Sequence, residues 1–442
     1  MVNAEKRTNK KTVAITTLGC KTNQFESAAM HEALACEGYC MVPFDGAADV
    51  YIINTCTVTA KTDAESRKLI RRAVRQNPAA HIVVTGCYAQ IAPDELKELP
   101  GVSLIIGNVE KKGIAGFLRE LNDTPKVMVS DISLERDGGG ASLETFAEHT
   151  RAFLQIQTGC DAFCSYCIVP HARGRSRSVP FEDALGGIAT FAERGFREVV
   201  LTGIHLGGYG LDLEPRRTLL DLLMAAEERE LVLRLRIGSV EPLEVSEEMI
   251  RIFASSRIIC PHLHIPLQSG DNHILGQMNR KYSTDYYREL LQRLTEAMPG
   301  VCLGTDIIAG FPGESEREFE NTYHFLDSLP LAYLHVFPFS PREGTPAATM
   351  PDHLYPSVIR ERSKALRRLS ELKRRAYYRS FLGEKLLVLV QGNNADGMLA
   401  GLSRNYIPVL LAGDETLVNT EVAVVVTDVV KERVIGRVVD YQ

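Results

Sequence analysis

Three cysteines lie within eight consecutive positions of "GCDAFCSYC" (159–167), a density typical of a metal centre. Cys160, Cys164 and Cys167 form the pattern C-x3-C-x2-C, and soft thiolates suit zinc or an iron–sulfur cluster. A structural zinc site needs a fourth ligand, which His171 could supply, and it usually shows a paired C-x2-C. The compact spacing favours a [4Fe–4S] cluster held through three irons, whose fourth iron is open to a substrate or cofactor.

A second set of three cysteines is spread over the first part of the chain. Cys20, Cys56 and Cys87 each end an apolar run, in "TLGC", "INTC" and "VTGC". The carboxyl ends of parallel strands share one edge of a sheet, so we expect these thiols to converge on an auxiliary cluster that could bind or donate sulfur. The alternative is three unrelated buried cysteines. The remaining thiols lack this pattern and are interpreted as core or incidental residues: Cys36, Cys40, Cys260 and Cys302.

The elements that must position these cysteines alternate between apolar runs and helical segments. Interleaved buried runs predict an open parallel α/β sheet over 10–131, followed by a glycine-rich linker over 132–147. The predicted strands of this domain are 12–19, 49–55, 81–86 and 102–108.

Two further domains are predicted. Six strands separated by helices over 148–378 indicate a partial (βα)6 barrel, and short strands over 380–442 indicate a small antiparallel β-barrel. The predicted strands of the central domain are 152–157, 198–203, 233–239, 262–267, 302–308 and 333–339. Those of the last domain are 385–392, 406–411, 421–430 and 433–440.

Composition bounds the class of protein. A chain of 442 residues fits about three domains. It has no apolar stretch long enough to span a bilayer and no signal-peptide pattern, so we expect a soluble cytoplasmic protein whose ten cysteines are metal or catalytic ligands rather than disulfides. Because the net charge is -6, any nucleic-acid contact must come from local basic patches.

Two such patches lie near the cysteines and a third lies later. Arg173, Arg175 and Arg177 follow the C-x3-C-x2-C motif directly, and we expect phosphate contacts rather than a merely solvated face. "KLIRRAVR" (68–75) places Lys68, Arg71, Arg72 and Arg75 at helical spacing after Cys56. The segment 360–379 predicts an amphipathic helix that packs through Leu366, Leu369 and Leu372 and is basic on its other side.

The C-x3-C-x2-C motif after the first strand of a six-strand βα domain resembles the radical S-adenosylmethionine (SAM) superfamily, whose unique iron binds SAM. "LTGIHLGGYG" (201–210), "IPLQSG" (265–270) and "TDIIAGFPGE" (305–314) are similar to its SAM-binding parts, although no Glu follows the glycines of the first. The resemblance implies SAM contacts from these residues: Phe163, Tyr166, Thr202, Gly203, His205, Ser239, Gln268, Ser269, Asp306 and Gly310.

Nearly the whole chain resembles the methylthiotransferases. The motifs are "TLGCKTNQFES" (17–27), "NTCTVTAKTDAESR" (54–67), "TGCYAQ" (85–90), "FPFSPREGTPA" (337–347) and a terminal segment like a TRAM domain. The second of these, with "CSYCIVPHARGRSRS" (164–178), is similar to the MtaB-type branch, which acts on N6-threonylcarbamoyladenosine at position 37 of tRNA.

The resemblance implies a reaction in two parts. The cluster on Cys160, Cys164 and Cys167 cleaves SAM to a 5′-deoxyadenosyl radical, which removes the hydrogen from adenine C2. The cluster on the other three cysteines delivers sulfur, and a second SAM supplies the methyl group. A radical is needed because no side-chain base can deprotonate this aromatic C–H. Implied partners are the tRNA anticodon loop and an electron donor such as flavodoxin or ferredoxin.

Other functions stay open at this point. Relatives with both clusters act on isopentenyladenosine in tRNA or on a ribosomal-protein aspartate. A more distant alternative is a non-catalytic iron–sulfur or zinc protein that binds RNA, against which the glycine loops at the strand ends of the barrel argue.

Overall fold

The computed structural model describes the chain in five stretches, which are 11–122, 124–139, 150–394, 397–430 and 432–439. It forms two compact units, one reaching to Arg136 and including Cys167–Arg175, the other formed by Asp137–Tyr166 and the chain from Ser176 onward. Part of the predicted linker, 140–147, lies outside the described residues, while its start contains the short 3-10 helix η2, Ile132–Leu134.

The first unit is built on a parallel sheet of six strands in the order β2-β1-β3-β4-β5-β6. The sheet predicted from the apolar runs is confirmed, with two short edge strands, β2 and β6, that the sequence pattern did not indicate. The strands are β1 Thr12–Thr17, β2 Cys40–Met41, β3 Val50–Thr55, β4 His81–Gly86, β5 Val102–Ile106 and β6 Lys126–Met128.

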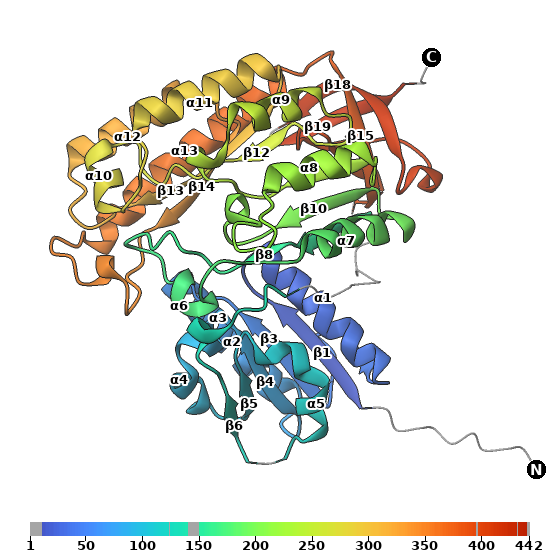
Figure 1. Ribbon diagram of the computed structural model, residues 1–442, viewed down its shortest axis with the longest axis vertical. Coiled ribbons are helices and arrows are strands. Elements are labelled where there is room, and N and C mark those ends of the chain that lie inside the picture. Colours follow the sequence, from blue (N-terminus) through green and yellow to red (C-terminus); the bar gives the residue numbers. More distant parts are fainter. Residues whose placement is uncertain (1–10, 123, 140–149, 395–396, 431, 440–442) are drawn as a thin grey trace, which may run out of the picture. The chain divides into compact units, whose positions relative to one another are not determined.

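Helices cover both faces of this sheet (Figure 1). The core on one face joins α1 (Lys21–Cys36) and α5 (Ile114–Arg119) to the strands through Met30, Leu34 and Ile114. The core on the other face joins α2, α3 and α4 through Ile70 and Tyr88. These helices are α2 Ala60–Gln76, α3 Cys87–Ile91 and α4 Pro93–Lys97, and α6 Val169–Arg173 also belongs to this unit.

The second unit begins with an incomplete barrel of two three-stranded parallel sheets, ordered β11-β10-β7 and β12-β13-β14. Isolated parallel bridges, Leu235↔Ile259 and Ser239↔His264, join the two sheets, so the predicted partial barrel is confirmed. Its strands are β7 Arg151–Gln155, β10 Glu198–Thr202, β11 Arg234–Ile237, β12 His262–His264, β13 Cys302–Ala309 and β14 Tyr333–Pro338. A two-stranded antiparallel ribbon, β8 Gln157–Thr158 with β9 Arg177–Ser178, frames the cysteine loop.

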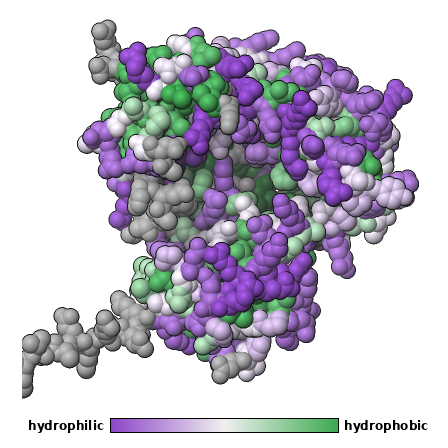
Figure 2. Space-filling model, turned by 180° about the vertical axis from the view of Figure 1, so that it is seen from behind, coloured by the Kyte–Doolittle hydropathy of each residue, from purple (hydrophilic) through white to green (hydrophobic). Residues whose placement is uncertain are grey.

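Helices alternate with these strands, as a βα barrel requires. They are α7 Phe181–Glu193, α8 Leu219–Glu228, α9 Glu247–Ser255, α10 Asn272–Gln277, α11 Thr284–Ala297, α12 Glu316–Ser328 and α13 Pro356–Arg379. The last packs against β14 through Leu366 and Leu369, but Leu372, predicted on the packed side, is 54% exposed. Among the described residues, no helix is both long and apolar enough to cross a membrane. Hydrophilic residues cover most of the face shown in Figure 2.

The C-terminal strands close into a five-stranded barrel in the order β15-β16-β17-β19-β18. One pairing corrects the sequence-based prediction of an antiparallel barrel, because β17 and β19 run parallel. The strand β16 was not predicted. The strands are β15 Lys385–Asn393, β16 Leu399–Ser403, β17 Pro408–Leu411, β18 Glu421–Val430 and β19 Arg433–Val438.

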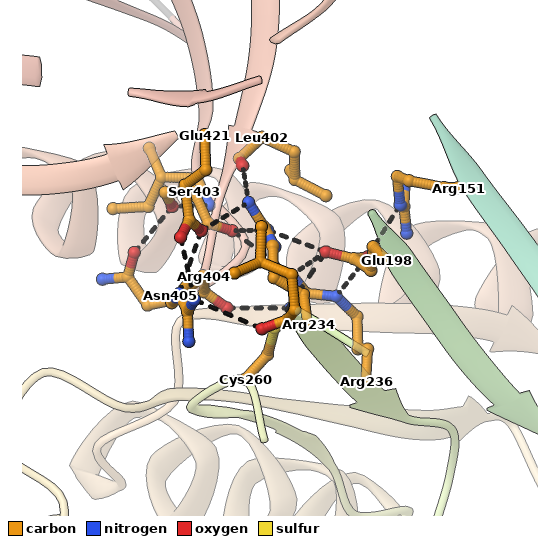
Figure 3. Close-up of polar contacts among 12 residues, drawn as sticks. Arg151, Glu198, Arg234, Arg236, Cys260, Leu402, Ser403, Arg404, Asn405 and Glu421 are labelled. Atoms are coloured by element: carbon orange, nitrogen blue, oxygen red, sulfur yellow. Dashed lines mark hydrogen bonds and ion pairs between the residues drawn. The ribbon is translucent and has the colours of Figure 1, made fainter. Parts of the chain in front are cut away.

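A buried ionic network joins this barrel to the partial barrel (Figure 3). The Glu198 carboxylate accepts from Arg234 and Arg236 at 2.7 and 2.9 Å, and all three side chains have no exposed surface. Arg234 also donates to the carbonyls of Leu402 and Ser403 at 2.9 and 3.0 Å. Burial alone would raise the pKa of Glu198, but the two arginines outweigh it and hold that pKa well below its usual range.

Candidate functional site

Cys20, Cys56 and Cys87 follow three strands that are neighbours in the sheet, β1, β3 and β4. The predicted convergence at the carboxyl edge therefore has its structural basis in the strand order. Cys20 is the N-cap residue of α1, and Cys87 is the first residue of α3. Cys56 and Cys87 are buried, and Cys20 is exposed.

Glycines before two of these cysteines allow the strand ends to approach each other. Gly19 has a φ of +100°, and a Cβ placed there would lie 2.9 Å from the Cys56 Sγ. Gly86 has a φ of +94°, and a Cβ there would collide with the Thr55 carbonyl oxygen. Any larger residue at either position would both strain the backbone and push the cysteine-bearing turns apart.

A charged cluster lies beside the three thiols, formed by Glu26, Lys111 and Arg173. The Glu26 carboxylate accepts from Arg173 at 2.6 Å and from Lys111 at 2.7 Å. Burial would lower the pKa of Arg173, but Glu26 and then the thiols of Cys87 and Cys20 raise it. Two cationic side chains thus share one carboxylate near the cysteine-bearing edge.

Asn23 connects this charged cluster to the strand ends. Its amide donates to the carbonyls of Leu18 and Thr55 at 2.7 and 3.0 Å, and its oxygen accepts from Arg173 at 2.5 Å. The carbonyls belong to the turns just before Cys20 and Cys56. A single buried amide therefore fixes two of the cysteine-bearing turns relative to the arginine.

The thiols of this edge fit a metal cluster by their chemistry. Burial, and then the neighbouring Cys87, raises the pKa of Cys56 to about 12. A thiolate there is unfavourable unless a metal ion stabilises it, and coordination does deprotonate a bound thiol.

A single zinc ion requires its thiolate ligands to lie close together. Tetrahedral thiolates around zinc lie about 3.8 Å apart, from Zn–S bonds of about 2.3 Å. Over the described part of the chain, two groups of three metal-binding side chains have ligand atoms within 4.8 Å of one another, and neither contains a cysteine.

The loop that bears Cys160 and Cys164 is anchored to α10. Ser165 donates from its hydroxyl to the Gln277 carbonyl at 2.8 Å, and Asn279 donates to the Phe163 carbonyl at 3.1 Å. Phe163 has a φ of +44°, a left-handed conformation between the two cysteines. Cys167 belongs to the first unit, although the chain keeps it within three residues of Cys164.

The thiol of Cys160 has a cationic neighbour. The His205 Nδ1 lies 3.7 Å from the Cys160 Sγ, and its Nε2 lies 2.5 Å from a Glu244 oxygen. Burial would lower the pKa of His205, but Cys160 and Glu244 raise it to about 11. Glu244 lies against Gly207, where a Cβ would collide with its carboxylate. A carboxylate from η4 (Pro242–Glu244) therefore lies against this glycine.

The thiol of Cys164 is also close to a cation. Arg280 donates to the Cys164 Sγ at 3.3 Å and pairs with Glu241. Burial raises the pKa of Glu241, while Arg280 opposes that rise. The negative charge that a thiolate-bound cluster carries would be balanced by Arg280 and His205. These donors fit a cluster on the cysteines, and Glu241 and Glu244 pair with the same two cations.

The other residues predicted to contact SAM differ in how far they are exposed to solvent. Thr202, Gln268 and Ser269 are buried, and Ser239 is exposed. Gln268 and Gly310 have φ values of +73° and +79° at the ends of later strands, where the backbone turns sharply. The Asp306 carboxylate is engaged by His264 and His335 rather than pointing to free space. Phe163 is 48% exposed, and the half-buried residues of this set are Tyr166, Gly203 and His205.

Two of the arginines predicted to contact RNA are buried and bonded within the protein. Arg173 is 2% exposed and bound to Glu26, and Arg177 is 5% exposed and donates to the Asp137 carbonyl at 3.1 Å. Neither guanidinium can meet a phosphate without leaving these partners. Arg175, between them, is exposed.

The basic residues of α2 remain available at the surface. Lys68, Arg71 and Arg75 are exposed, and Arg72 is exposed but pairs with Asp45 at 2.5 Å. In α13 one arginine departs from the predicted basic face, because Arg362 is buried against Glu314 at 2.7 Å. The exposed basic residues of this helix are Arg360, Lys364, Arg367, Arg368, Arg375 and Arg379.

The sequence pattern missed the residues that surround the cysteines. Asn23 and Glu26 stand three and six residues beyond Cys20 in one motif, and "EPLE" (241–244) follows β11 as the cysteines follow their strands. Acidic residues just beyond a strand end are a signal that could have identified Glu241 and Glu244. Nothing local distinguishes Lys111 or Arg280 from other basic residues.

Two family models match this chain, one over the first domain and one over the central domain. Residues 12–107 match the family described as "Uncharacterized protein family UPF0004", and residues 154–326 match the radical SAM superfamily. The radical SAM methyltransferase TsrM from Kitasatospora setae, solved with cobalamin and a [4Fe–4S] cluster, aligns with a TM-score of 0.54 at 15% identity, covering 77% of each chain. That likeness shows the shared fold.

Relatives of known name extend over almost the whole chain. The threonylcarbamoyladenosine tRNA methylthiotransferase MtaB of Bacillus subtilis is 40% identical over 93% of each chain. That of Aquifex aeolicus is 39% identical over 91% of this chain and 97% of its own. A tRNA-2-methylthio-N(6)-dimethylallyladenosine synthase of Pelotomaculum thermopropionicum is 32% identical over 93% of this chain and 94% of its own. Because these relatives cover almost the whole chain and both family models match it, the chain belongs to the MtaB-type methylthiotransferase family of radical SAM proteins.

Proposed function

We propose that this chain is a tRNA methylthiotransferase that converts N6-threonylcarbamoyladenosine at position 37 of tRNA to its 2-methylthio derivative. The observation that carries the proposal is the pair of separate three-cysteine sets, one at the strand ends of β1, β3 and β4 and one in the loop after β8. The names of the relatives at 40% and 39% identity support the substrate.

Each cysteine set is assigned a [4Fe–4S] cluster. Cys20, Cys56 and Cys87 would hold the auxiliary cluster, and the C-x3-C-x2-C loop would hold the cluster that binds SAM. When bound, the two clusters and SAM supply radical generation, sulfur and a methyl group. An external reductant such as flavodoxin or ferredoxin would provide the electrons.

The protein's own residues hold and orient these groups. Arg280 and His205 donate toward the thiols of the SAM-binding loop, which favours the negative charge of a thiolate-bound cluster. Glu241 and Glu244 lie beside those cations and are suited to accept from the ammonium group of SAM. Sharp turns with positive φ at Gln268 and Gly310 follow the later strands β12 and β13.

For tRNA, the exposed Lys68, Arg71 and Arg175 and the basic side of α13 are the proposed phosphate contacts. The C-terminal barrel, proposed as TRAM-like, would support binding through shape and selected side chains. Sequence likeness at 32% to a synthase for dimethylallyladenosine keeps that nucleoside as the second candidate substrate.

The test is anaerobic reconstitution followed by turnover on defined substrates. The chain should hold about eight irons, from two clusters of four. With SAM and reductant it should add a methylthio group to tRNA that bears the threonylcarbamoyl group, as read by nucleoside mass spectrometry. Product from isopentenylated tRNA or from a ribosomal protein instead, with none from the threonylcarbamoyl substrate, would refute the proposed function. A content of about four irons would remove the auxiliary cluster from it.

A further inference from the structure

Three neighbouring strands of the partial barrel bring two histidines and an aspartate together without any cysteine. In the parallel register His264 stands opposite Gly304, and Asp306 stands opposite His335. Gly304 and Asp306 are two residues apart on β13, so their positions face the same side of the sheet. The side chains of His264, Asp306 and His335 consequently gather on one face of β12, β13 and β14.

Their ligand atoms have the separations that one metal ion imposes. The Asp306 Oδ1 lies 2.9 Å from the His264 Nε2 and 3.4 Å from the His335 Nδ1. Ligands about 2.0–2.1 Å from zinc lie about 2.9 Å apart at right angles and about 3.4 Å apart in a tetrahedron. The three atoms also lie within 4.8 Å of one another.

One ring nitrogen of His264 is held by a hydrogen-bond partner, as is usual for histidines that bind a metal through the other nitrogen. Tyr333 lies over Gly304, where a Cβ would collide with its ring, and its hydroxyl lies 3.2 Å from the His264 Nδ1 and 2.9 Å from the His262 Nε2. The tautomer that donates from Nδ1 to Tyr333 leaves the lone pair of Nε2 facing the Asp306 oxygen. In that tautomer two acceptors face each other at 2.9 Å and a cation between them is favourable, whereas the other tautomer donates from Nε2 to Asp306 as a hydrogen bond.

We propose that His264, Asp306 and His335 form a site for one divalent transition-metal ion, with zinc as the ion that the donor set fits. Two imidazoles and a carboxylate suit zinc or ferrous iron rather than magnesium or calcium, which take oxygen ligands. Three protein ligands leave a coordination position for water or an anionic oxygen. The site shares no ligand with the two cysteine sets and does not depend on the proposed function.

The ion has a route to this site from solvent. His335 is 55% exposed at its side chain, whereas Asp306 is 23% and His264 is 9% exposed. Tyr333 and His335 also line a cavity of about 240 Å³ with Tyr406 and Arg374. Of the three proposed ligands, His335 is the one that lines this cavity and the one most exposed to solvent.

The second group of close metal-binding side chains, Asp271, His273 and Glu318, has another explanation. Asp271 caps α10 by accepting from the backbone of His273 and Ile274, and Glu318 completes the capping box of α12 with Ser315. The carboxylates of Asp271 and Glu318 therefore already stabilise the starts of two helices. This group provides a matched control, because His273 is 65% exposed and pairs with Glu318 at 2.6 Å much as His335 approaches Asp306.

The experiment measures zinc bound to the full chain with its clusters reconstituted. After passage over a chelating resin, the protein is dialysed against radioactive ⁶⁵Zn²⁺, and zinc and iron per chain are counted. The wild type and His273→Ala should bind one zinc that His335→Ala and Asp306→Asn lack, with equal iron in all four. Tyr333→Phe keeps the ligands and should weaken zinc affinity by about 10–100-fold, as loss of an outer hydrogen bond does.

Each other outcome counts against the site. Equal zinc in the wild type, His335→Ala and Asp306→Asn, or no zinc in the wild type, would mean that the three side chains form only a hydrogen-bonded cluster. Equal loss in His273→Ala would mean non-specific surface binding. The exposure of His335 makes its alanine variant the one least prone to misfold, so a folded chain that keeps its zinc is a decisive refutation.

Discussion

Arg173 forms a bidentate pair with Glu26, with Nη1 2.6 Å from one carboxylate oxygen and Nη2 3.0 Å from the other. Arg173 lies six residues beyond Cys167, and Glu26 lies six residues beyond Cys20. The segment Cys167–Arg175 is part of the first unit, so the end of the C-x3-C-x2-C loop belongs to the same unit as Cys20, Cys56 and Cys87. This pair gives the arginine a structural task in place of the predicted phosphate contact.

Replacing Arg173 by alanine should therefore harm the fold and the auxiliary cluster. The change leaves Glu26 buried without its main partner, and breaking a buried pair costs about 3–5 kcal/mol. Denaturant unfolding and iron analysis should show a less stable chain that loses more iron than Arg175→Ala, which alters an exposed arginine. Unchanged stability with reduced tRNA affinity would restore the phosphate role.

The same pair predicts a dependence of stability on pH. Burial would raise the pKa of Glu26, but Arg173 and Lys111 lower it from 4.5 to about 2. Because the folded pKa lies below the unfolded one, the stabilisation is present above pH 4.5 and is lost as the pH falls towards 2. This shift corresponds to at most about 3 kcal/mol.

Glu26→Gln should flatten the loss of stability over that range, as followed by circular dichroism during denaturant unfolding at a series of pH values. Glu65→Gln, which changes an exposed carboxyl of α2, is the control and should leave the slope unaltered. Identical profiles for the wild type and Glu26→Gln would contradict the assigned pKa shift.

The two cysteine sets should separate in single variants. Cys164→Ala should abolish SAM cleavage, measured as 5′-deoxyadenosine, because it removes a ligand of the SAM-binding cluster. Cys56→Ala should spare cleavage and stop formation of the methylthio product. Cys36→Ala, in a thiol outside both sets, should retain both activities. Equal loss of cleavage in the first two variants would show that their roles are divided wrongly.

The basic face of α2 should contribute to tRNA affinity through charge alone. Removing one cationic side chain that binds a phosphate lowers the salt slope of binding by about one. The double variant Lys68→Ala/Arg71→Ala should therefore bind tRNA more weakly and reduce the slope by about two, as measured by filter binding at several salt concentrations. Arg72→Ala should have a smaller effect, because Arg72 already pairs with Asp45. An unchanged slope in the double variant would exclude this face.

Glu198 should be needed for the junction with the C-terminal barrel. Glu198→Gln leaves Arg234 and Arg236 without a buried counter-charge, which should cost about 3–5 kcal/mol. The comparison is Glu230→Gln, in an exposed pair with Arg257 at 2.5 Å, which should cost less than about 1 kcal/mol. Thermal unfolding of both variants measures the difference, and equal midpoints would mean that the network is not important for stability.

Local sequence patterns were sufficient for the order and type of the main elements. Apolar runs of four to eight residues bounded by turns predict β1, β3 and β4, because burial on both faces leaves a continuous hydrophobic signature. The edge strand β2, with two residues, and β16, interrupted by Gly401, carry no such signature. Leu372 continues the helical spacing of Leu366 and Leu369 but faces solvent. The spacing predicts which side of the helix is apolar, but it does not predict how much of that side the neighbouring strand covers.

Residue types and short spacings along the chain are enough to predict the two cysteine sets and the strands that end in them. The charged groups that meet those thiols, and the residues that pair elsewhere, are seen only once the chain is folded. Arg173 and Glu26 are 147 positions apart, and His264 and Asp306 are 42 apart. Such pairs arise from strand order and packing, and these long-range contacts leave no periodic pattern along the chain.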